Sequence, residues 1–461
     1  MYFKFVFDKS LAQASYVVGC QKEGIAAVID PKRDVDTYLK IAEENDLKIT
    51  HILETHIHAD FLCGSRELAE LTGAEMYLSD EGDENWKYQF PHNALKNGSQ
   101  IRLGNVLIEA LHTPGHTPEH LSFVVTDEAA CDEPVMLFSG DFVFVGDIGR
   151  PDLLDKISGN KNSGNEGAYQ QFESIKELFK LKDYIQIWPG HGAGSSCGKS
   201  LGAVPTTTLG YEKIRNWALQ FGSDKEGFVK ELLADQPEPP TYYKKMKQLN
   251  KEERPLLTHV PDAKNLSESA YRKAKDSGFN IIDTREREEY AKGHLRESWN
   301  FIFNNTFSTK MGWFMPYDEP FVVIAEEEQS EDIVRQLMRI GLDELHGFIT
   351  PKQFLEWEKE NLVTAKNIDL ETLKAKMNNP DVQLVDVRSE KEYNDGHIGN
   401  AINLFFGTID ENANAVPKDK EVIVYCQSGG RASAAYSVLQ SLGFENITVY
   451  PGGWSEWSGE A

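Results

Sequence analysis

The chain has 461 residues, and its 48 Lys and Arg against 73 Asp and Glu give a formal net charge of −25. This length predicts about three domains of ordinary size, each able to bury its own core. The negative charge excludes a general binder of nucleic acid or of anionic membranes, because both partners require a basic surface. A local basic pocket for a small anion is still compatible with it.

The first residues and the cysteines indicate the expected compartment. Residues 1–9 carry charges inside a short apolar stretch, so they favour a strand over a signal peptide. No stretch approaches the roughly 18 apolar residues of a membrane-spanning helix. The cysteines are odd in number and widely separated, which argues against a disulfide framework. They are Cys20, Cys63, Cys131, Cys197 and Cys426. We therefore expect a cytoplasmic protein in a reducing compartment.

The N-terminal third alternates predicted strands and helices. Apolar runs bounded by turn residues predict the strands, and helical spacing of apolar residues predicts the helices. In chain order these are strands at 2–7, 15–18 and 26–30, a helix at 35–45, a strand at 49–53, a helix at 65–71 and a strand at 74–78. This alternation, with polar residues at strand ends, predicts an α/β layered sandwich.

A short-range group of metal-ligand types follows the strand at 49–53. His56, His58 and Asp60 alternate along residues 55–61, whose sequence is THIHADF. Imidazole and carboxylate together suit zinc, iron or manganese better than calcium or magnesium. Two histidines in a surface loop are the alternative interpretation, but matching partners further along the chain weaken it.

Three later segments supply those partners. Pro114 and Gly115 predict a turn that lets His116 project from a loop. Asp141 follows the apolar run at 135–138, and His191 follows the predicted strand at 185–188. We expect these three side chains to meet the first group, whereas the neighbouring histidines at 112 and 120 are as compatible with a structural role.

These four segments resemble one family. The order T-H-x-H-x-D, P-G-H-T, S-G-D and P-G-H-G resembles the metallo-β-lactamase superfamily over residues 1–245. Within it, the chain is most similar to the branch of glyoxalase II and the persulfide dioxygenases. The stretches at 58–60 (HAD) and 149–152 (GRPD) match the dioxygenase side. The resemblance implies an αββα sandwich around a metal centre.

Phe61 departs from the two-metal hydrolases of this superfamily. Those enzymes carry a histidine directly after the aspartate that corresponds to Asp60, and that histidine binds the second metal. Phenylalanine cannot bind a metal, so a two-zinc site is hard to build here. The departure argues against thioester hydrolysis by a metal-bound hydroxide. It does not argue against sulfur oxidation at one iron.

By resemblance, the metal would be one Fe(2+) held by His56, His116 and Asp141. Two imidazoles and one carboxylate leave open positions for a substrate and O2. His58 and Asp60 would then orient the ligands, and His191 would line the substrate pocket. His58 remains a possible ligand of a zinc-like site, and Zn(2+) remains the alternative metal.

Two residues near this centre are candidates for substrate chemistry. Arg150 is expected to bind an anionic substrate group, with a salt bridge as the alternative. Cys197 lies in the glycine-rich segment 191–199, where Lys199 is expected to stabilise a thiolate. Similar fusion proteins carry a cysteine in this context, so we expect Cys197 to act as an auxiliary persulfide carrier. A buried inert cysteine is the alternative.

Beyond a Pro-rich and then charged stretch at 236–255, the chain repeats itself. We place the domains at 1–245, 246–362 and 363–461. The middle and last domains share the motif D-x-R-x-x-x-E-Y-x-x-G-H, at 283–294 and 386–397. This motif resembles the rhodanese domain, a small α/β fold around a mostly parallel sheet.

The last copy carries the nucleophile that the middle copy lacks. Cys426 ends the predicted strand at 422–425, and Gly429, Gly430 and Arg431 lead into a helix. Successive backbone N–H groups and the helix dipole would hold an anionic persulfide or thiosulfate there, and the arginine adds a fixed charge. Cys-x4-Arg also occurs in phosphatases, but the upstream motif favours sulfur transfer.

In the middle copy, the corresponding segment is acidic and has no glycine. An acidic residue, Glu326, is expected at the position of the nucleophile. Such a loop would repel an anionic sulfur species, so we expect this domain to be inactive. It is expected to pack the outer domains together or to form a contact in a homo-oligomer.

The sequence therefore predicts a persulfide dioxygenase joined to a sulfurtransferase. Iron and O2 would oxidise a low-molecular-weight or inorganic persulfide to sulfite, and Cys426 would pass a sulfane sulfur to sulfite to give thiosulfate. The reverse transfer, from thiosulfate to a persulfide, uses the same residues. The alternatives are a zinc-dependent glyoxalase II-like thioester hydrolase fused to a sulfurtransferase, and a sulfide-sensing or sulfur-carrier protein without turnover.

Overall fold

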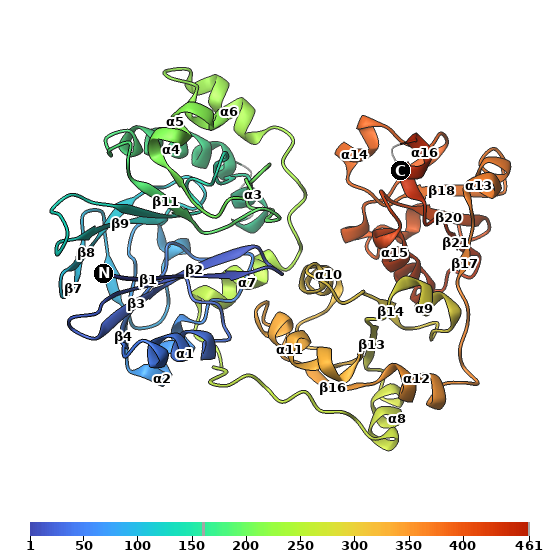
Figure 1. Ribbon diagram of the computed structural model, residues 1–461. Helices are drawn as coiled ribbons and strands as arrows, with labels where there is room; N and C mark the ends of the chain where they lie inside the picture. The colour runs from blue at the N-terminus through green and yellow to red at the C-terminus, as the bar shows by residue number, and fades with distance from the viewer. Residues whose placement is uncertain (159–161, 460–461) are drawn as a thin grey trace. The chain divides into compact units, whose positions relative to one another are not determined.

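The computed structural model describes residues 1–158 and 162–459, which form two compact units (Figure 1). The first unit comprises Met1–Pro261 together with Met338–Gly341. The second comprises Asp262–Leu337 and Leu342–Ala461. Among the residues described, no helix is long and apolar enough to cross a membrane.

The first unit contains two six-stranded sheets. One sheet has the order β1-β2-β3-β4-β5-β6, with β1 (Tyr2–Asp8), β2 (Gln13–Cys20), β3 (Ile25–Ile29), β4 (Lys48–Leu53), β5 (Glu75–Ser79) and β6 (Asn93–Leu95). The other has the order β12-β11-β10-β9-β8-β7, with β7 (Gln100–Leu103), β8 (Val106–His112), β9 (Leu121–Asp127), β10 (Met136–Gly140), β11 (Gln186–Pro189) and β12 (Thr207–Thr208).

Helices cover the outer face of each sheet, which makes the predicted αββα sandwich. The first sheet carries α1 (Asp36–Glu44) and α2 (Ser65–Thr72). The second carries α4 (Ser163–Leu178), α5 (Leu209–Arg215) and α6 (Lys225–Leu233), and α3 (Leu153–Ser158) precedes them. Because strand side chains alternate between faces, Tyr16 of β2 packs on Phe138 of the other sheet, with ring centroids 4.7 Å apart. Its neighbour Val17 packs outward with Tyr38 of α1.

The Pro-rich stretch leads into a further helix of the first unit. Helix α7 (Tyr243–Lys251) follows it, and its buried face includes Met246 and Asn250. The sequence analysis placed the domain boundary at 245, within this helix, whereas the compact unit runs through Pro261. Because the sequence of α7 is mostly charged and polar, the composition alone did not indicate that this helix packs into the first unit.

The second unit contains two parallel sheets, one for each copy of the repeat. The middle copy has the order β14-β13-β15-β16 and the last copy β17-β21-β20-β18-β19. The middle copy comprises α8 (Glu268–Asp276), β13 (Asn280–Asp283), α9 (Arg287–Lys292), β14 (Trp299–Asn300), α10 (Phe307–Phe314), β15 (Phe321–Ile324), α11 (Ser330–Met338), β16 (Leu345–Ile349) and α12 (Pro351–Trp357). The last copy comprises β17 (Lys366–Asn367), α13 (Leu370–Lys376), β18 (Val382–Asp386), α14 (Glu390–Asp395), β19 (Ala401–Asn403), β20 (Glu421–Tyr425), α15 (Gly430–Ser441), β21 (Ile447–Val449) and α16 (Gly453–Ser458).

The residues of the repeated motif make the same contacts with one another in both copies. Arg285 donates to Asp283 Oδ2 at 2.6 Å, and Arg388 makes the matching bond to Asp386 Oδ2 at 2.8 Å. Each arginine also donates to the carbonyl of the glycine before the motif histidine. In both copies that histidine stacks on the motif tyrosine, with ring centroids 3.9 and 3.8 Å apart. The shared residues therefore fix the fold of each copy.

Strand pairing shows which residue of the middle copy stands where the last copy has its cysteine. The last residues of β15 and β20 each pair with the motif aspartate of their own copy. The residue that follows is Ala325 in the middle copy and Cys426 in the last copy. The prediction that Glu326 takes this position is therefore wrong by one residue. Alanine has no nucleophile, so the expected lack of a thiol still holds.

Candidate metal centre and cysteine site

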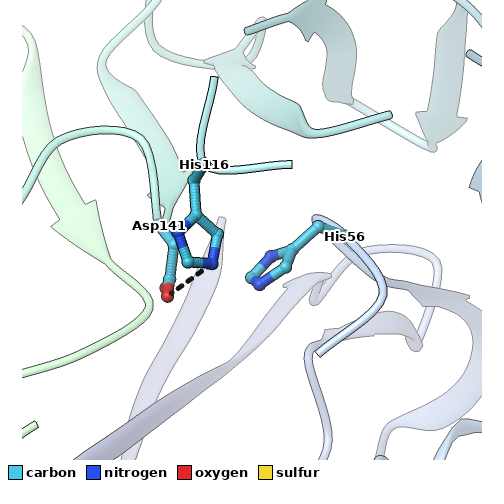
Figure 2. A group of neighbouring side chains, drawn as sticks. All are labelled: His56, His116 and Asp141. Atoms are coloured by element: carbon cyan, nitrogen blue, oxygen red, sulfur yellow. Dashed lines mark ion pairs between the residues drawn. The ribbon is translucent and has the colours of Figure 1, made fainter. Parts of the chain in front are cut away.

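Three side chains from three different loops converge in the first unit (Figure 2). His56 follows β4, His116 lies between β8 and β9, and Asp141 follows β10 directly. One ligand atom of each lies within 4.8 Å of the others, and all three residues are buried. His116 Nε2 is 3.5 Å from Asp141 Oδ2. The structure therefore brings together the three residues for which the sequence predicts metal binding.

The free atoms of this group fit a divalent metal ion. Among residues 1–158 and 162–459, His56 Nε2 and both Asp141 carboxylate oxygens have no hydrogen-bond partner although they are buried, which is costly unless an ion satisfies them. His116 Nδ1 donates to Arg150 O at 2.9 Å, so Nε2 is left to face the centre. Burial lowers the pKa of both histidines, which favours the neutral imidazole that binds metals.

Glycine is required where two strands deliver the carboxylate. Gly140, just before Asp141, has φ +50, a left-handed conformation that favours glycine. A Cβ at Gly190, at the end of β11, would lie 2.6 Å from Asp141 Oδ1. The glycines of the S-G-D and P-G-H motifs therefore let the two strand ends approach each other around the carboxylate.

A second group of donors lies beside the first. Asp60, His191 and Cys197 have ligand atoms within 4.8 Å of one another, and all three are buried. His191 Nε2 is 3.2 Å from Asp60 Oδ2 and 3.5 Å from Asp141 Oδ2, without hydrogen-bond geometry. The sequence analysis gave these residues separate roles and missed the set. Only the glycine-rich loop after His191 indicated that a cysteine there could turn back toward the site.

The surroundings of Cys197 disfavour its thiolate when no cation is bound nearby. Burial raises its pKa well above the ordinary value, and the carboxylates of Asp60 and Asp141 raise it further. Lys199 does not compensate, because its Nζ donates to Glu231 O and lies over the Trp217 ring. The prediction that Lys199 stabilises a thiolate is therefore wrong.

His58 is occupied by a carboxylate outside both groups. Its Nε2 lies 3.1 Å from Asp30 Oδ1. Burial lowers the pKa of His58, but Asp30 outweighs burial and raises it to about 9. A raised pKa disfavours the neutral imidazole that binds metals, and His58 is not part of the group formed by His56, His116 and Asp141. Phe61 is fully buried with its ring 4.4 Å from the ring of His58, so an apolar side chain fills the space next to this histidine.

The cysteine of the last copy lies in a loop closed by its own backbone. Cys426 directly follows β20, is 2% exposed, and accepts a hydrogen bond on Sγ from Gly429 N at 3.1 Å. Gly429 has φ +92 and precedes α15. The predicted strand, glycine turn and helix are all present, so the thiol faces the N-terminal end of a helix of 12 residues.

The arginine of this loop is already paired. Arg431 donates from Nη1 and Nη2 to the two carboxylate oxygens of Glu392, both at 2.7 Å. Burial raises the pKa of Glu392, but Arg431 outweighs it and lowers the pKa to about 2. The positive charge that the sequence analysis assigned to the anion is therefore balanced by this carboxylate.

Comparisons with known proteins agree with this architecture. The model of the metallo-β-lactamase superfamily matches residues 10–191, and the model of the rhodanese-like domain matches 258–355 and 369–460. A crystal structure of a metallo-β-lactamase from Staphylococcus aureus is 43% identical with a TM-score of 0.71, and the match covers 76% of this chain and 99% of that one. The chain belongs to the metallo-β-lactamase superfamily.

Two further relatives match the N-terminal part of this superfamily member. Hydroxyacylglutathione hydrolase GloC from Haemophilus influenzae is 29% identical over 199 residues, which are 39% of this chain and 86% of that protein. ETHE1 from Myxococcus xanthus is 26% identical with a TM-score of 0.44, over 54% of this chain and 96% of that one. The metallo-β-lactamase fold binds metal, and the matched residues 10–191 contain His56, His116 and Asp141 as well as Asp60 and His191 of the second donor group.

Arg150 contacts one of the candidate metal ligands, His116. Its guanidinium donates to both oxygens of Asp152, at 2.8 and 2.5 Å, and to Ser196 O at 3.1 Å. Its carbonyl accepts the bond from His116. Binding of a substrate anion by Arg150, as the sequence predicts, would require breaking this buried pair. The observed contacts instead orient His116.

Asn250 of α7 bonds to the loop that follows the first candidate ligand, His56. Its side chain accepts from Cys63 N at 2.8 Å and donates to His58 O at 2.8 Å and Phe61 O at 2.7 Å. Asn250 is 5% exposed. Sequence reasoning did not find it, because a single asparagine in a charged helix carries no motif.

Replacing Asn250 with alanine is expected to destabilise the first unit by about 3 kcal/mol, because buried backbone groups lose their partners. Metal affinity is expected to fall about 10-fold, since the loop is no longer fixed. Urea unfolding of the full chain and titration with Fe(II) measure the two effects. The exposed Gln248 of the same helix provides the control, Gln248→Ala. If Asn250→Ala kept the wild-type urea midpoint and Fe(II) affinity, the conformation of the loop would not depend on the Asn250 hydrogen bonds.

Proposed function

We propose that the protein oxidises persulfides with O2 to sulfite at one iron and transfers sulfane sulfur on Cys426. The observation that carries the proposal is the buried group of His56, His116 and Asp141. Two imidazoles and one carboxylate are the ligand set of non-haem Fe(II) oxygenases, and the ion supplies open positions where an anionic sulfur and O2 can bind. The fused rhodanese-like domains support sulfur as the substrate element.

The two reactions balance and share sulfite. A persulfide RSSH, O2 and water give RSH, sulfite and two protons. A persulfide on Cys426 then reacts with sulfite: the S–S bond to the cysteine breaks, and its electron pair stays on Cys426. A new S–S bond forms to the sulfite sulfur, which gives thiosulfate and a free thiolate. The reverse of this step uses the same groups.

Within the first unit, the chain's own residues prepare the site. Arg150 O fixes the tautomer and direction of His116. Burial of every donor excludes bulk water, which protects a reactive persulfide from side reactions. Cys197 lies beside this group and would act as an auxiliary sulfane-sulfur carrier once its thiol has lost its proton, because the thiolate is the nucleophile.

Metal content and O2 uptake of the full chain test the proposal. The purified protein is incubated with glutathione persulfide, coenzyme A persulfide or inorganic polysulfide in an oxygen electrode. We expect one iron per chain, O2 consumption with at least one of these persulfides, and sulfite or thiosulfate as product. Two zincs per chain and no O2 uptake would contradict the proposal.

The second donor group favours one rival, a two-metal thioester hydrolase. Carboxylate, imidazole and thiolate from Asp60, His191 and Cys197 are ligand types that zinc prefers. They provide a second site despite Phe61, which the sequence analysis regarded as an obstacle to one. The name of the relative GloC, hydroxyacylglutathione hydrolase, points the same way.

Replacing Cys197 with alanine separates the two functions. Under the proposed function, iron stays at one per chain and O2 uptake persists, because the His56–His116–Asp141 group is untouched. Under the rival, metal content falls from two ions to one and hydrolysis of S-lactoylglutathione is lost. Inductively coupled plasma mass spectrometry and a thioester assay measure these outcomes. Cys131→Ser, at an exposed cysteine, serves as the control.

A further inference from the structure

The middle copy of the repeat reaches into the cysteine loop of the last copy. Arg287, the first residue of α9, donates from Nη1 to Ser428 O at 2.7 Å. Its Nε pairs with Glu288 at 2.7 Å, but the Glu288 carboxylate is exposed, so water screens this pair far more than the pairs of Arg431 and Arg388 in the last copy. A Cβ at Gly429 would lie 2.0 Å from Arg287 Nη1, so the glycine whose N–H donates to Cys426 Sγ leaves room for this guanidinium. Both copies belong to the same compact unit.

A second cation of the middle copy lies on α10. Lys310 is half-buried, and its ammonium makes no hydrogen bond or ion pair within the described part of the chain. Helix α10 contacts the 3-10 turn Phe406–Thr408, which also contacts α15. Burial lowers the pKa of Lys310, whereas the charges of Cys426 and Glu286 oppose that shift. The lysine therefore lies close enough to Cys426 to interact with an anion there.

Aromatic contacts fix α10 against the last copy. The ring of Trp313 lies 5.4 Å from that of Phe405, and the ring of Phe314 lies 5.0 Å from that of Phe406. Trp313 also packs on Gly407, where a Cβ would lie 2.6 Å from the indole. The position of Lys310 relative to the cysteine loop is thus set by packing rather than by its own side chain.

The last copy by itself has little free positive charge for its substrate. Arg431 is neutralised by Glu392 and Arg388 by Asp386. Sulfite and thiosulfate are dianions, which require hydrogen-bond donors and cations around them. The loop backbone and the helix end supply donors, so the missing cations must come from elsewhere.

We propose that Arg287 and Lys310 of the middle copy bind the sulfur oxyanion that reacts at Cys426. The inactive copy thereby sets the specificity of the active one for small dianionic sulfur acceptors and donors. This inference rests on the proposed sulfur transfer. The cations hold the oxyanion while its sulfur bonds to the outer sulfur of the Cys426 persulfide and the cysteine sulfur leaves with the electron pair.

The test uses the full chain with Cys426 loaded with sulfane sulfur from polysulfide. The variants Arg287→Gln and Lys310→Gln are compared with the wild type in the reaction of this persulfide with sulfite and with dithiothreitol. Dithiothreitol carries no sulfur oxyanion group. Each variant is expected to raise the KM for sulfite about 10-fold, the value of one charge-assisted contact, while discharge by dithiothreitol stays unchanged. Lys310→Arg is expected to restore sulfite discharge.

Controls keep the outcome interpretable. Arg272→Gln removes an exposed arginine of the same copy that donates to Glu268 within α8 and to the carbonyl of Trp357, and it is expected to leave both reactions unchanged. An equal loss with sulfite and dithiothreitol would assign Arg287 and Lys310 a structural role and overturn the inference. So would wild-type kinetics in both variants. A wild-type chain that cannot be loaded at Cys426 would instead contradict the proposed function.

Discussion

Replacing Asp141 with alanine is expected to remove the metal ion and to lower the rate of O2 consumption with persulfides at least about 100-fold. The carboxylate is fully buried, and within the described residues neither of its oxygens has a hydrogen-bond partner. Its removal leaves this group with two imidazoles and no anionic ligand, because Asp60 belongs to the neighbouring donor group. Sulfur transfer on Cys426 is expected to continue, because that site lies in the other compact unit. Metal analysis, an oxygen electrode and a thiosulfate assay measure the three quantities.

The matched control is Asp132→Ala, which removes an exposed aspartate of the same unit. It is expected to leave metal content and O2 uptake unchanged. If Asp141→Ala retained one iron and full O2 uptake, the oxidation would have to occur elsewhere in the chain. Loss of both oxidation and sulfur transfer would indicate that the variant fails to fold rather than that a ligand is missing.

Replacing Cys426 with serine is expected to have the opposite effect. A hydroxyl cannot carry a sulfane sulfur, so sulfur transfer is expected to fall by at least about 1000-fold. Iron binding and O2 uptake are expected to persist, and sulfite should accumulate in place of thiosulfate. Chromatography of the sulfur products over time measures the change.

Cys131→Ser, at an exposed cysteine, is the control for the loss of a thiol as such. Thiosulfate formed at the wild-type rate by Cys426→Ser would refute the coupling between the two sites. Persulfide oxidation would then be complete without the rhodanese-like domains. Such a result would agree with the proposed metal centre but would leave the fusion to the rhodanese-like domains without a role in thiosulfate formation.

Much of the metal centre could be predicted from the sequence, because its donors lie in short motifs at strand ends. The chemistry of His56, His116 and Asp141 is visible in their residue types and order. The neighbouring donor set was not predictable, because Cys197 joins Asp60 only through the course of a loop. Asn250 was hidden for the same reason, since its three backbone partners lie far away in the sequence.

The repeat shows where local similarity misleads. Aligning the apolar runs placed Glu326 at the position of the nucleophile, whereas parallel strand pairing places Ala325 there. Sequence similarity also suggested that the middle copy would repel an anion. The structure instead places Arg287 against the cysteine loop, because helix packing selects which side of a charged segment faces the neighbour.

The sequence by itself determined the fold class, the motif order and the donor types, since periodicity and strand-end motifs are local properties of the chain. Only the tertiary structure decided which donors share a centre, that Asp30 occupies His58 and that Glu392 neutralises Arg431. Burial and charge pairing depend on distances between segments far apart in the sequence. The same residue types can therefore serve as metal ligand, structural ion pair or anion-binding group. Which role each residue takes depends on the distances that folding fixes.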